Sequence, residues 1–255
     1  MIEHKSPAQI EVMRESGRVV ANALATVRKH AKVGVSLREL DDLAASVIRD
    51  AGAKPSFLHY HPDWAPAPYP AVICTSVNDA VVHGLPTNYR LAEGDLLSVD
   101  CGAYIDGLHG DAAVSFIVGK EDPIDKKLIE DTERALHAGI DAAQPGAKMG
   151  DVGHAIGSIG RSLGYGLLAD HGGHGVGRSM HEDPLVPNEG RSGRGWKLRP
   201  GLVIALEPMF ILGGSDDYWT DPDGWTLRTA HGARAAHAEH TIAITEDGPV
   251  ILTAP

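Results

Sequence analysis

Residues Gly94–Phe116 read GDLLSVDCGAYIDGLHGDAAVSF, and this stretch decides the fold class. Two runs rich in apolar and β-branched residues flank Asp106-Gly107, a dipeptide typical of a two-residue hairpin turn. The sequence therefore predicts an antiparallel hairpin over residues 96–118, and with it a sheet that contains antiparallel strands.

The same hairpin brings two carboxylates together. A two-residue turn without a bulge places Gly102 opposite Asp111, and Asp100 then lies two residues along the same face. Asp100 and Asp111 become diagonal neighbours, about 7 Å apart at the backbone, with no side chain at Gly102 between them. Their apolar flanks make two unpaired charges costly, so a proton or a cation is expected there. Two ordinary aspartates on a solvent-facing strand are the alternative for the hairpin taken alone.

Three further candidate ligands lie downstream. Glu207 ends the apolar run VIALEP, Glu239 begins EHTIAI, and His174 is flanked by glycines in HGGHGVGRSMHEDP (171–184). Charged residues beside buried strands are rarely left unpaired. Four carboxylates and one imidazole suit two divalent cations, which lower the pKa of bound water.

Two helix pairs with the same pattern recur along the chain. Ser6 with Gln9, and Ser36 with Glu39, form capping boxes that begin two helices with apolar stripes. The matching positions 112 residues apart are Gly34 and Gly146, Leu40 and Val152, Val47 and Ile159, and Gly52 and Gly164. We therefore predict a duplicated α+β unit, with each helix pair covering half of a sheet. Its halves span about 10–118 and 122–253 within one domain over 1–255.

Strand and loop signals fill the rest of the chain. Apolar, β-branched runs predict strands at 71–77, 199–210 and 239–253. The last of these is expected to be a hairpin that turns at Asp247-Gly248. Residues 61–70 and 213–225 are predicted to be loops because they are rich in proline, glycine or aspartate.

Composition narrows the function classes. The 255 residues are 43% hydrophobic, enough for a sizeable core, and their formal charge of −11 argues against DNA or an anionic membrane as a partner. Two cysteines, the lack of a long apolar run and the lack of a signal peptide favour a soluble, cytoplasmic chain. Four histidines without a motif are expected on the surface: His30, His59, His137 and His154.

Six motifs together resemble one family. They are VNDAVVHGLP (77–86), the hairpin at 94–116, the loop at 171–184, PGLVIALEPM (200–209), PDGWTLRT (222–229) and AEHTIAIT (238–245). In order and spacing they resemble type I methionine aminopeptidases, metallopeptidases of family M24, subfamily A, that remove the initiator methionine from nascent proteins. The resemblance implies the pita-bread fold, a pseudo-twofold duplication in which helices cover a curved antiparallel sheet. It also implies that the chain is a hydrolase, a methionyl aminopeptidase acting when the second residue is small.

The resemblance assigns the metal ligands. Asp100 is implied to chelate one metal, Asp111 and Glu239 to bridge two, and His174 with Glu207 to complete the first metal's shell. The implied cofactors are two divalent ions, Co, Mn, Fe or Zn. The resemblance further implies that water activated by this dinuclear centre attacks the first peptide bond, with Glu207 as the candidate general base.

Two histidines and an aromatic pocket are implied to bind substrate. His83 is expected at the substrate amine or as a proton shuttle, and His181 at the scissile carbonyl, where it stabilises the oxyanion. The methionine side chain is implied to lie among sulfur and aromatic residues: Cys74, Tyr69, Tyr60, Phe57, Met180 and Trp225. The family also carries a structural monovalent cation, whose matching positions are Asn78, Ala80 and Ala235.

The chain departs from the family pattern in two places. The loop YHPDWAPAPYP is longer than the family's usual YHGYP, so that Tyr60, Trp64 or Tyr69 could each reach the pocket. His237-Ala238 stands where the family usually has a glutamine and an aromatic residue, which alters the support for Glu239.

The expected partners are nascent polypeptide N-termini, with transient ribosome contact made by the catalytic domain itself. We expect a monomer that binds neither DNA nor membrane. Two alternatives stay open: a Xaa-Pro peptidase with the same fold and ligands, and a non-catalytic binding module that has lost its metals. No role is assigned to His171.

Overall fold

The structure is a computed structural model that describes residues 2–168 and 170–254. Its elements in chain order are α1 (Pro7–His30), α2 (Leu37–Asp50), β1 (Lys54–Pro55), β2 (Ile73–Val77), β3 (Ala80–Val82), β4 (Leu96–Ile105), β5 (Leu108–Ile117), α3 (Pro123–Ala142), α4 (Met149–Ser162), β6 (Gly166–Leu167), β7 (Gly172–Gly175), β8 (Glu182–Pro187), β9 (Val203–Leu206), β10 (Met209–Ile211), β11 (Tyr218–Thr220), β12 (Leu227–Thr229), β13 (Ala235–His237), β14 (Glu239–Thr245) and β15 (Gly248–Ile251).

The helix pairs form as predicted. Ser6 and Gln9 make a complete capping box at the start of α1, and Ser36 and Glu39 make another at the start of α2. The α4 helix begins and ends 112 residues after α2, as the repeat predicts. The chain takes a left-handed turn at Gly34 (φ 89°) before α2 and again at Gly146 (φ 93°) before α4.

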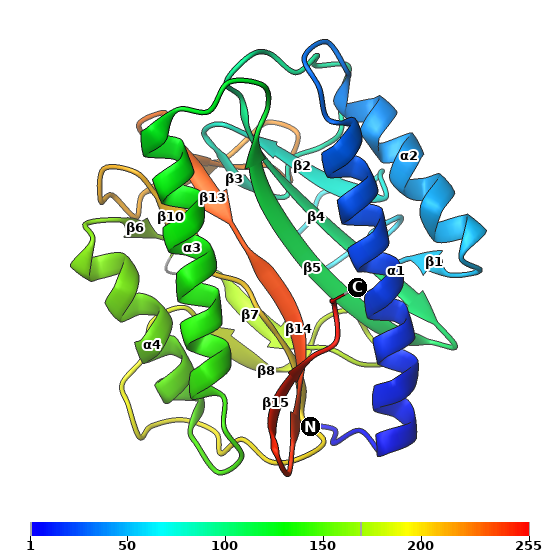
Figure 1. The fold of residues 1–255 in the computed structure, drawn as a ribbon, viewed down its shortest axis with the longest axis vertical. Helices are drawn as coiled ribbons and strands as arrows, with labels where there is room; N and C mark the ends of the chain where they lie inside the picture. The colour runs from blue at the N-terminus through cyan, green and yellow to red at the C-terminus, as the bar shows by residue number, and fades with distance from the viewer. Residues whose placement is uncertain (1, 169, 255) are drawn as a thin grey trace.

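A nine-stranded antiparallel sheet carries both helix pairs. Its main path runs β1-β4-β5-β14-β9-β7-β8, with β2 added beside β4 and β15 beside β14. Figure 1 shows α1 and α2 along the half that contains β4 and β5, and α3 and α4 along the half that contains β7 and β8. One core packs Val20, Leu24 and Leu40 beneath the first pair, and a second packs Leu136 and Ile156 beneath the other. The α+β class and the covered antiparallel sheet are confirmed.

The carboxylate hairpin has the predicted register. Ile105 pairs with Leu108, and Gly102 pairs with Asp111. The Asp106-Gly107 turn has positive φ at both residues, 50° and 75°, which is the geometry of a type I′ turn. Asp100 and Asp111 therefore point to the same side of the sheet.

Two secondary-structure predictions are wrong. The last hairpin turns at Glu246-Asp247, because Thr245 pairs with Gly248 across a two-residue loop. The Thr245 hydroxyl fixes this turn: it accepts from the Asp247 amide and donates to the Gly248 carbonyl. The second error is the loop at 213–225, which contains β11. Its residues Tyr218–Thr220 are good strand formers and pair with β12.

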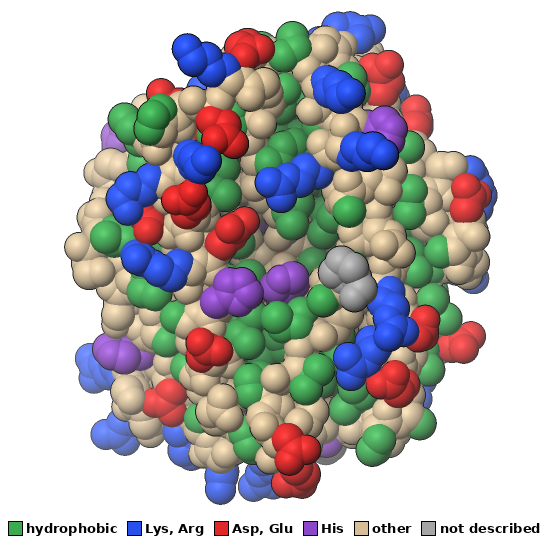
Figure 2. Space-filling view, in the orientation of Figure 1, with side chains coloured by type: hydrophobic (Ala, Val, Ile, Leu, Met, Phe, Trp, Pro, Cys, Tyr) green, Lys and Arg blue, Asp and Glu red, His purple; other side chains and the backbone are tan. Residues whose placement is uncertain are grey.

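Other expectations are confirmed in the described residues. Residues 61–70 form a loop without helix or strand, and the four motif-free histidines are exposed. Cys74 and Cys101 are buried free thiols. No helix of the described chain is long and apolar enough to cross a membrane. On the face shown in Figure 2, basic and acidic side chains are intermixed.

The close packing of α1 on the C-terminal segment generates a stability prediction. A Cβ atom at Gly17 would collide with the Leu252 carbonyl. We expect Gly17→Ala to destabilise the fold by about 1–3 kcal/mol, although alanine in a helix is otherwise favoured by about 1 kcal/mol. Urea unfolding of this variant, beside Asn22→Ala on the exposed face of α1, measures the effect. Equal stability of Gly17→Ala and the unmutated chain would contradict the packing.

Candidate metal centre and active site

One deep cleft contains all five candidate ligands. It has a volume of about 820 Å³, and residues of both sheet halves and of the loops between strands line it, Glu207 directly after β9 among them. The polar residues that line it include Asp100, Asp111, His174, Glu207, Glu239, His83, His171 and His181. The cleft thus gathers residues that lie up to 182 positions apart in the chain, from Phe57 to Glu239.

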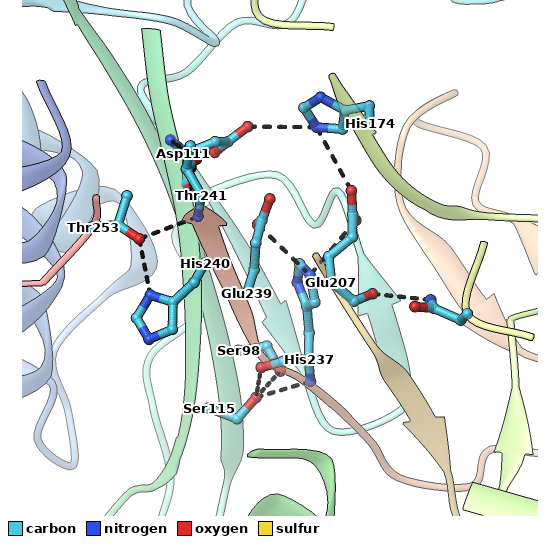
Figure 3. A network of polar contacts seen from close by, with 11 residues as sticks. Ser98, Asp111, Ser115, His174, Glu207, His237, Glu239, His240, Thr241 and Thr253 are labelled. Carbon is cyan, nitrogen blue, oxygen red and sulfur yellow. Dashed lines mark hydrogen bonds and ion pairs between the residues drawn. The ribbon is translucent and has the colours of Figure 1, made fainter. Parts of the chain in front are cut away.

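The ligand atoms of three residues lie close enough to share one cation. Atoms of Asp111, His174 and Glu239 are all within 4.8 Å of one another, and all three residues are buried. The His174 Nε2 atom is 3.9 Å from Asp111 Oδ2 and 3.6 Å from Glu207 Oε1. Figure 3 shows these side chains converging from β5, β7, β14 and the end of β9.

The backbone orients the imidazole of His174 for ligation. Its Nδ1 atom lies 2.9 Å from the Gly175 carbonyl oxygen, which only a protonated nitrogen can approach so closely as a donor. The proton on Nδ1 leaves the Nε2 lone pair free to face the carboxylates. The second ring nitrogen is thus held by a backbone carbonyl, as is common for histidines that ligate a metal.

Burial sets the electrostatics of the cluster. It raises the pKa of Asp100 to about 7, although interactions with Asp111 and the Cys101 backbone act to lower that pKa. Burial, followed by the neighbouring carboxylates, also raises the pKa values of Asp111 and Glu239 well above their ordinary range. Burial lowers the pKa of His174 to about 4.

These shifts show how well the site suits a cation. Asp100 Oδ1 and Asp111 Oδ1 are buried atoms with no hydrogen-bond partner. Four carboxyl groups that resist ionisation together, beside a neutral imidazole, are the donor set that a divalent cation compensates. Solvent-facing aspartates, the alternative for the hairpin alone, are contradicted, because Asp111 is only 3% exposed.

His237 was recognised in the sequence only as a departure, and the structure places it inside the cluster. Its Nε2 atom lies 3.7 Å from Glu207 Oε2 and 3.8 Å from Glu239 Oε2. The Ser115 hydroxyl accepts from the His237 amide and donates to its carbonyl. The only sequence signal was its position, two residues before a candidate ligand.

The remaining histidines also line the cleft. The His181 ring lies 4.0 Å from that of His174 and 5.1 Å from that of Tyr60, between centroids. His83 has a left-handed backbone, φ 60°, which is uncommon for a residue with a side chain. The ring of His171 lies 6.4 Å from that of His83, so this residue lines the cleft as well.

The predicted sulfur and aromatic residues form one cluster next to the carboxylates. Its buried members are Phe57, Ala65, Tyr69, Ala71, Cys74, Met180 and Trp225, with Tyr60 packed against them. Tyr69 meets Trp225 edge to face at 5.0 Å. A Cβ atom at Gly102 would lie 2.9 Å from the Phe57 ring, so the glycine between the two aspartates makes room for the pocket wall.

The longer loop contributes an additional ring. Tyr60, Trp64 and Tyr69 all line the cleft. Trp64 is 59% exposed, stacks on His83 with centroids 6.2 Å apart, and meets Trp225 at 5.0 Å.

The residues matched to a monovalent cation site are neighbours in space. The Asn78 carbonyl accepts from the Ala235 amide at 3.0 Å, and Ala80 lies two residues further along, at the start of β3. Asn78 has a positive φ of 57° and donates through its side chain to Asp95.

Comparisons with known proteins agree with this geometry. The model of metallopeptidase family M24 matches residues 11–246. The chain is 49% identical to methionine aminopeptidase 1 of Mycobacterium tuberculosis, over 99% of this chain and 95% of that protein. It is 44% identical to the methionine aminopeptidase of Aquifex aeolicus, over 99% and 98% of the two chains.

Solved structures extend the likeness to three dimensions. The crystal structure of methionine aminopeptidase from Thermotoga maritima superimposes with a TM-score of 0.95 at 42% identity, covering 100% of both chains. Prolidase from Pyrococcus furiosus has a TM-score of 0.79 at 22% identity, over 99% of this chain and 65% of that one. The second likeness shows the fold alone, and both confirm the predicted pita-bread fold.

The shared ligand atoms generate a metal-binding prediction. We expect His174→Ala to weaken Mn²⁺ binding at least about 10-fold, since loss of even a ligand's supporting partner costs about 10–100-fold. Isothermal titration calorimetry measures the affinity. His240→Ala is the matched control, because His240 lies beside Glu239 but hydrogen-bonds to Thr253. Unchanged affinity in His174→Ala would show that the cluster is not the ion site.

The raised carboxyl pKa values generate a pH prediction. Groups that hold protons near neutrality must release them when a cation binds, so Mn²⁺ affinity should rise between about pH 6 and pH 8. Calorimetry in buffers of different ionisation enthalpy counts the released protons. Asp100→Asn should lower the number of released protons, since its amide does not titrate, while the other carboxyl groups of the cluster still do. Proton-independent binding in the unmutated chain would contradict the prediction.

Proposed function

Because the chain belongs to metallopeptidase family M24, alongside methionine aminopeptidases, we propose that it removes N-terminal methionine from proteins whose second residue is small. One observation carries this proposal: the sulfur and aromatic pocket and the carboxylate cluster share one cleft. Nascent polypeptide N-termini would be its substrates. We place this activity in the cytoplasm, with transient contact to the ribosome.

We propose that the five candidate ligands hold two divalent ions. Asp111, His174 and Glu239 can share one ion with Glu207, whose Oε1 lies 3.6 Å from His174 Nε2. Asp100 would add oxygens for a second ion, which Asp111 and Glu239 would bridge to the first. Divalent ions in such a site polarise a carbonyl and lower the pKa of bound water, which is the chemistry that hydrolysis of the first peptide bond requires.

The protein's own groups would move the protons. Glu207 Oε1 lies 3.6 Å from His174 Nε2, so its carboxylate lines the space where an attacking water would be held and could take its proton. Glu207 is therefore proposed as the general base. The same group can then return the proton to the departing amine.

Two histidines would bind the peptide around the scissile bond. His181 lies on the His174 side of the cleft, where a ring N–H can donate to the scissile carbonyl oxygen as negative charge develops there. His83 lies beside Trp225, with ring centroids 6.4 Å apart. Burial lowers the pKa of His83 to about 4, so its ring is neutral and can accept a hydrogen bond from the substrate amine.

The pocket explains selection of the first residue. Met180, Cys74 and Trp225 offer soft, apolar contacts, and a thioether gains about 0.3–1.5 kcal/mol from each sulfur–aromatic contact. We propose that the second residue lies between the carboxylates and His83, where a large side chain would be crowded. This crowding is our reason for proposing a small second residue.

Peptide cleavage tests the proposed specificity. Met-Ala-Ser and Met-Gly-Met should be cleaved after methionine, whereas Met-Leu-Ser should be cleaved at least about 100-fold more slowly, because a misplaced reacting bond costs about that much. Mass spectrometry of the products, with Mn²⁺ present, measures the ratio. Gly-Pro peptides distinguish the proposed activity from its main alternative, because cleavage confined to these peptides would identify a Xaa-Pro peptidase.

A further inference from the structure

The segment before α1 makes a buried ion pair with the loop that carries His181. The Lys5 ammonium group lies 2.7 Å from Glu182 Oε2, and only 2% of the Lys5 side chain is exposed. Glu182 follows His181 directly and is the first residue of β8. The two partners are separated by 177 residues, so this contact fixes the segment and the loop to each other.

Glu182 closes its own loop around this ion pair. Its second carboxylate oxygen, Oε1, accepts from the Ser179 amide at 3.0 Å. Although burial acts in the opposite direction, the hydrogen bonds from Lys5 and Ser179 hold the pKa of Glu182 below its ordinary value. The carboxylate therefore stays charged, and one side chain joins Lys5 to the turn that precedes His181.

Other contacts keep Lys5 from moving away. Its backbone amide donates to the Gly201 carbonyl at 2.6 Å, on the loop that leads into β9. Its ammonium group also lies 3.4 Å from Glu3 Oε2. A Cβ atom at Gly177 would collide with both Lys5 Nζ and Glu182 Oε2, so the loop passes directly over the pair.

His181 depends on such support more than its neighbour does. Met180 is buried in the aromatic cluster, whereas His181 is exposed in the cleft. The position of the His181 ring is therefore set by its backbone and by ring contacts with His174 and Tyr60.

We propose that Lys5 is a positioning residue for the reaction: its ion pair with Glu182 holds loop 177–182 so that His181 faces the scissile carbonyl. This inference rests on the proposed function, in which His181 stabilises the oxyanion. Lys5 itself lies behind the loop and touches no reacting atom. Because Met180 is held independently, loss of the pair should alter the chemical step and spare binding of the methionine side chain.

The test replaces the ammonium group and follows both the loop and the reaction. Lys5→Met should increase hydrogen–deuterium exchange of residues 177–182 and lower kcat by about 10- to 100-fold, the cost of a displaced catalytic group. KM and Mn²⁺ affinity should change less than about twofold. Lys5→Arg, which keeps the charge, should retain most of kcat. Lys127→Met, which removes the Lys127–Asp131 ion pair on α3, is the matched control and should change neither readout.

A second variant keeps the proposal testable if Lys5→Met does not fold. Gly177→Ala retains both charges but pushes the ammonium and carboxylate groups apart, and should reproduce the loop exchange and the kcat loss. Unchanged exchange of 177–182, or a kcat within about twofold of the unmutated chain, would overturn the role of Lys5. His181→Ala is measured in parallel. If that variant keeps full kcat, the proposed role of His181 is wrong, while the exchange data still decide whether Lys5 holds the loop.

Discussion

The burial of four carboxyl groups around one cavity is the constraint on which the rest of this structure depends. Like charges in a poorly solvated space repel, and each would be more stable in water. The chain keeps them there because each is attached to a strand or strand end that cannot turn away without losing its own pairing. Asp111 lies in mid-strand opposite Gly102, and Glu239 lies opposite Ala113. The sheet holds the carboxyl groups together, and they keep protons near neutrality until a cation compensates their charges.

The duplicated helix pairs provide that rigidity. Each pair packs a separate apolar core against one half of the sheet, and the site lies between the two halves. Neither half contains all the candidate ligands. Asp100 and Asp111 come from the first half, and His174, Glu207 and Glu239 from the second. Helix packing, far from the cleft, thus determines the separation of the groups within it.

Local sequence signals predicted the hairpin that carries Asp100 and Asp111 and the starts of the first two helices. The Asp106-Gly107 turn fixed the register of the hairpin, and the serine capping boxes fixed where α1 and α2 begin. Signals failed where pairing partners are distant. The strand at Tyr218–Thr220 forms against β12, and its loop-like neighbours concealed it. The contacts of His237 and Lys5 could not be predicted from sequence for the same reason. Their partners lie in other elements, and no sequence spacing connects the residues. His83 and His181 were identified as candidates by the family resemblance, because no periodic pattern marks either residue.

The segment from β13 to β14 changes sheets beside the candidate ligands. Up to His237 it pairs with β10 in a three-stranded sheet, and from Glu239 it pairs with β5 and β9 in the large one. At the crossing, the Ser115 hydroxyl satisfies both backbone groups of His237, in the place of a neighbouring strand. Glu239 is thus the first residue after a joint between two sheets. A cation held by Glu239, Asp111 and His174 would cross-link the three strands β14, β5 and β7. Occupancy of the site would therefore stiffen the junction between the two sheets.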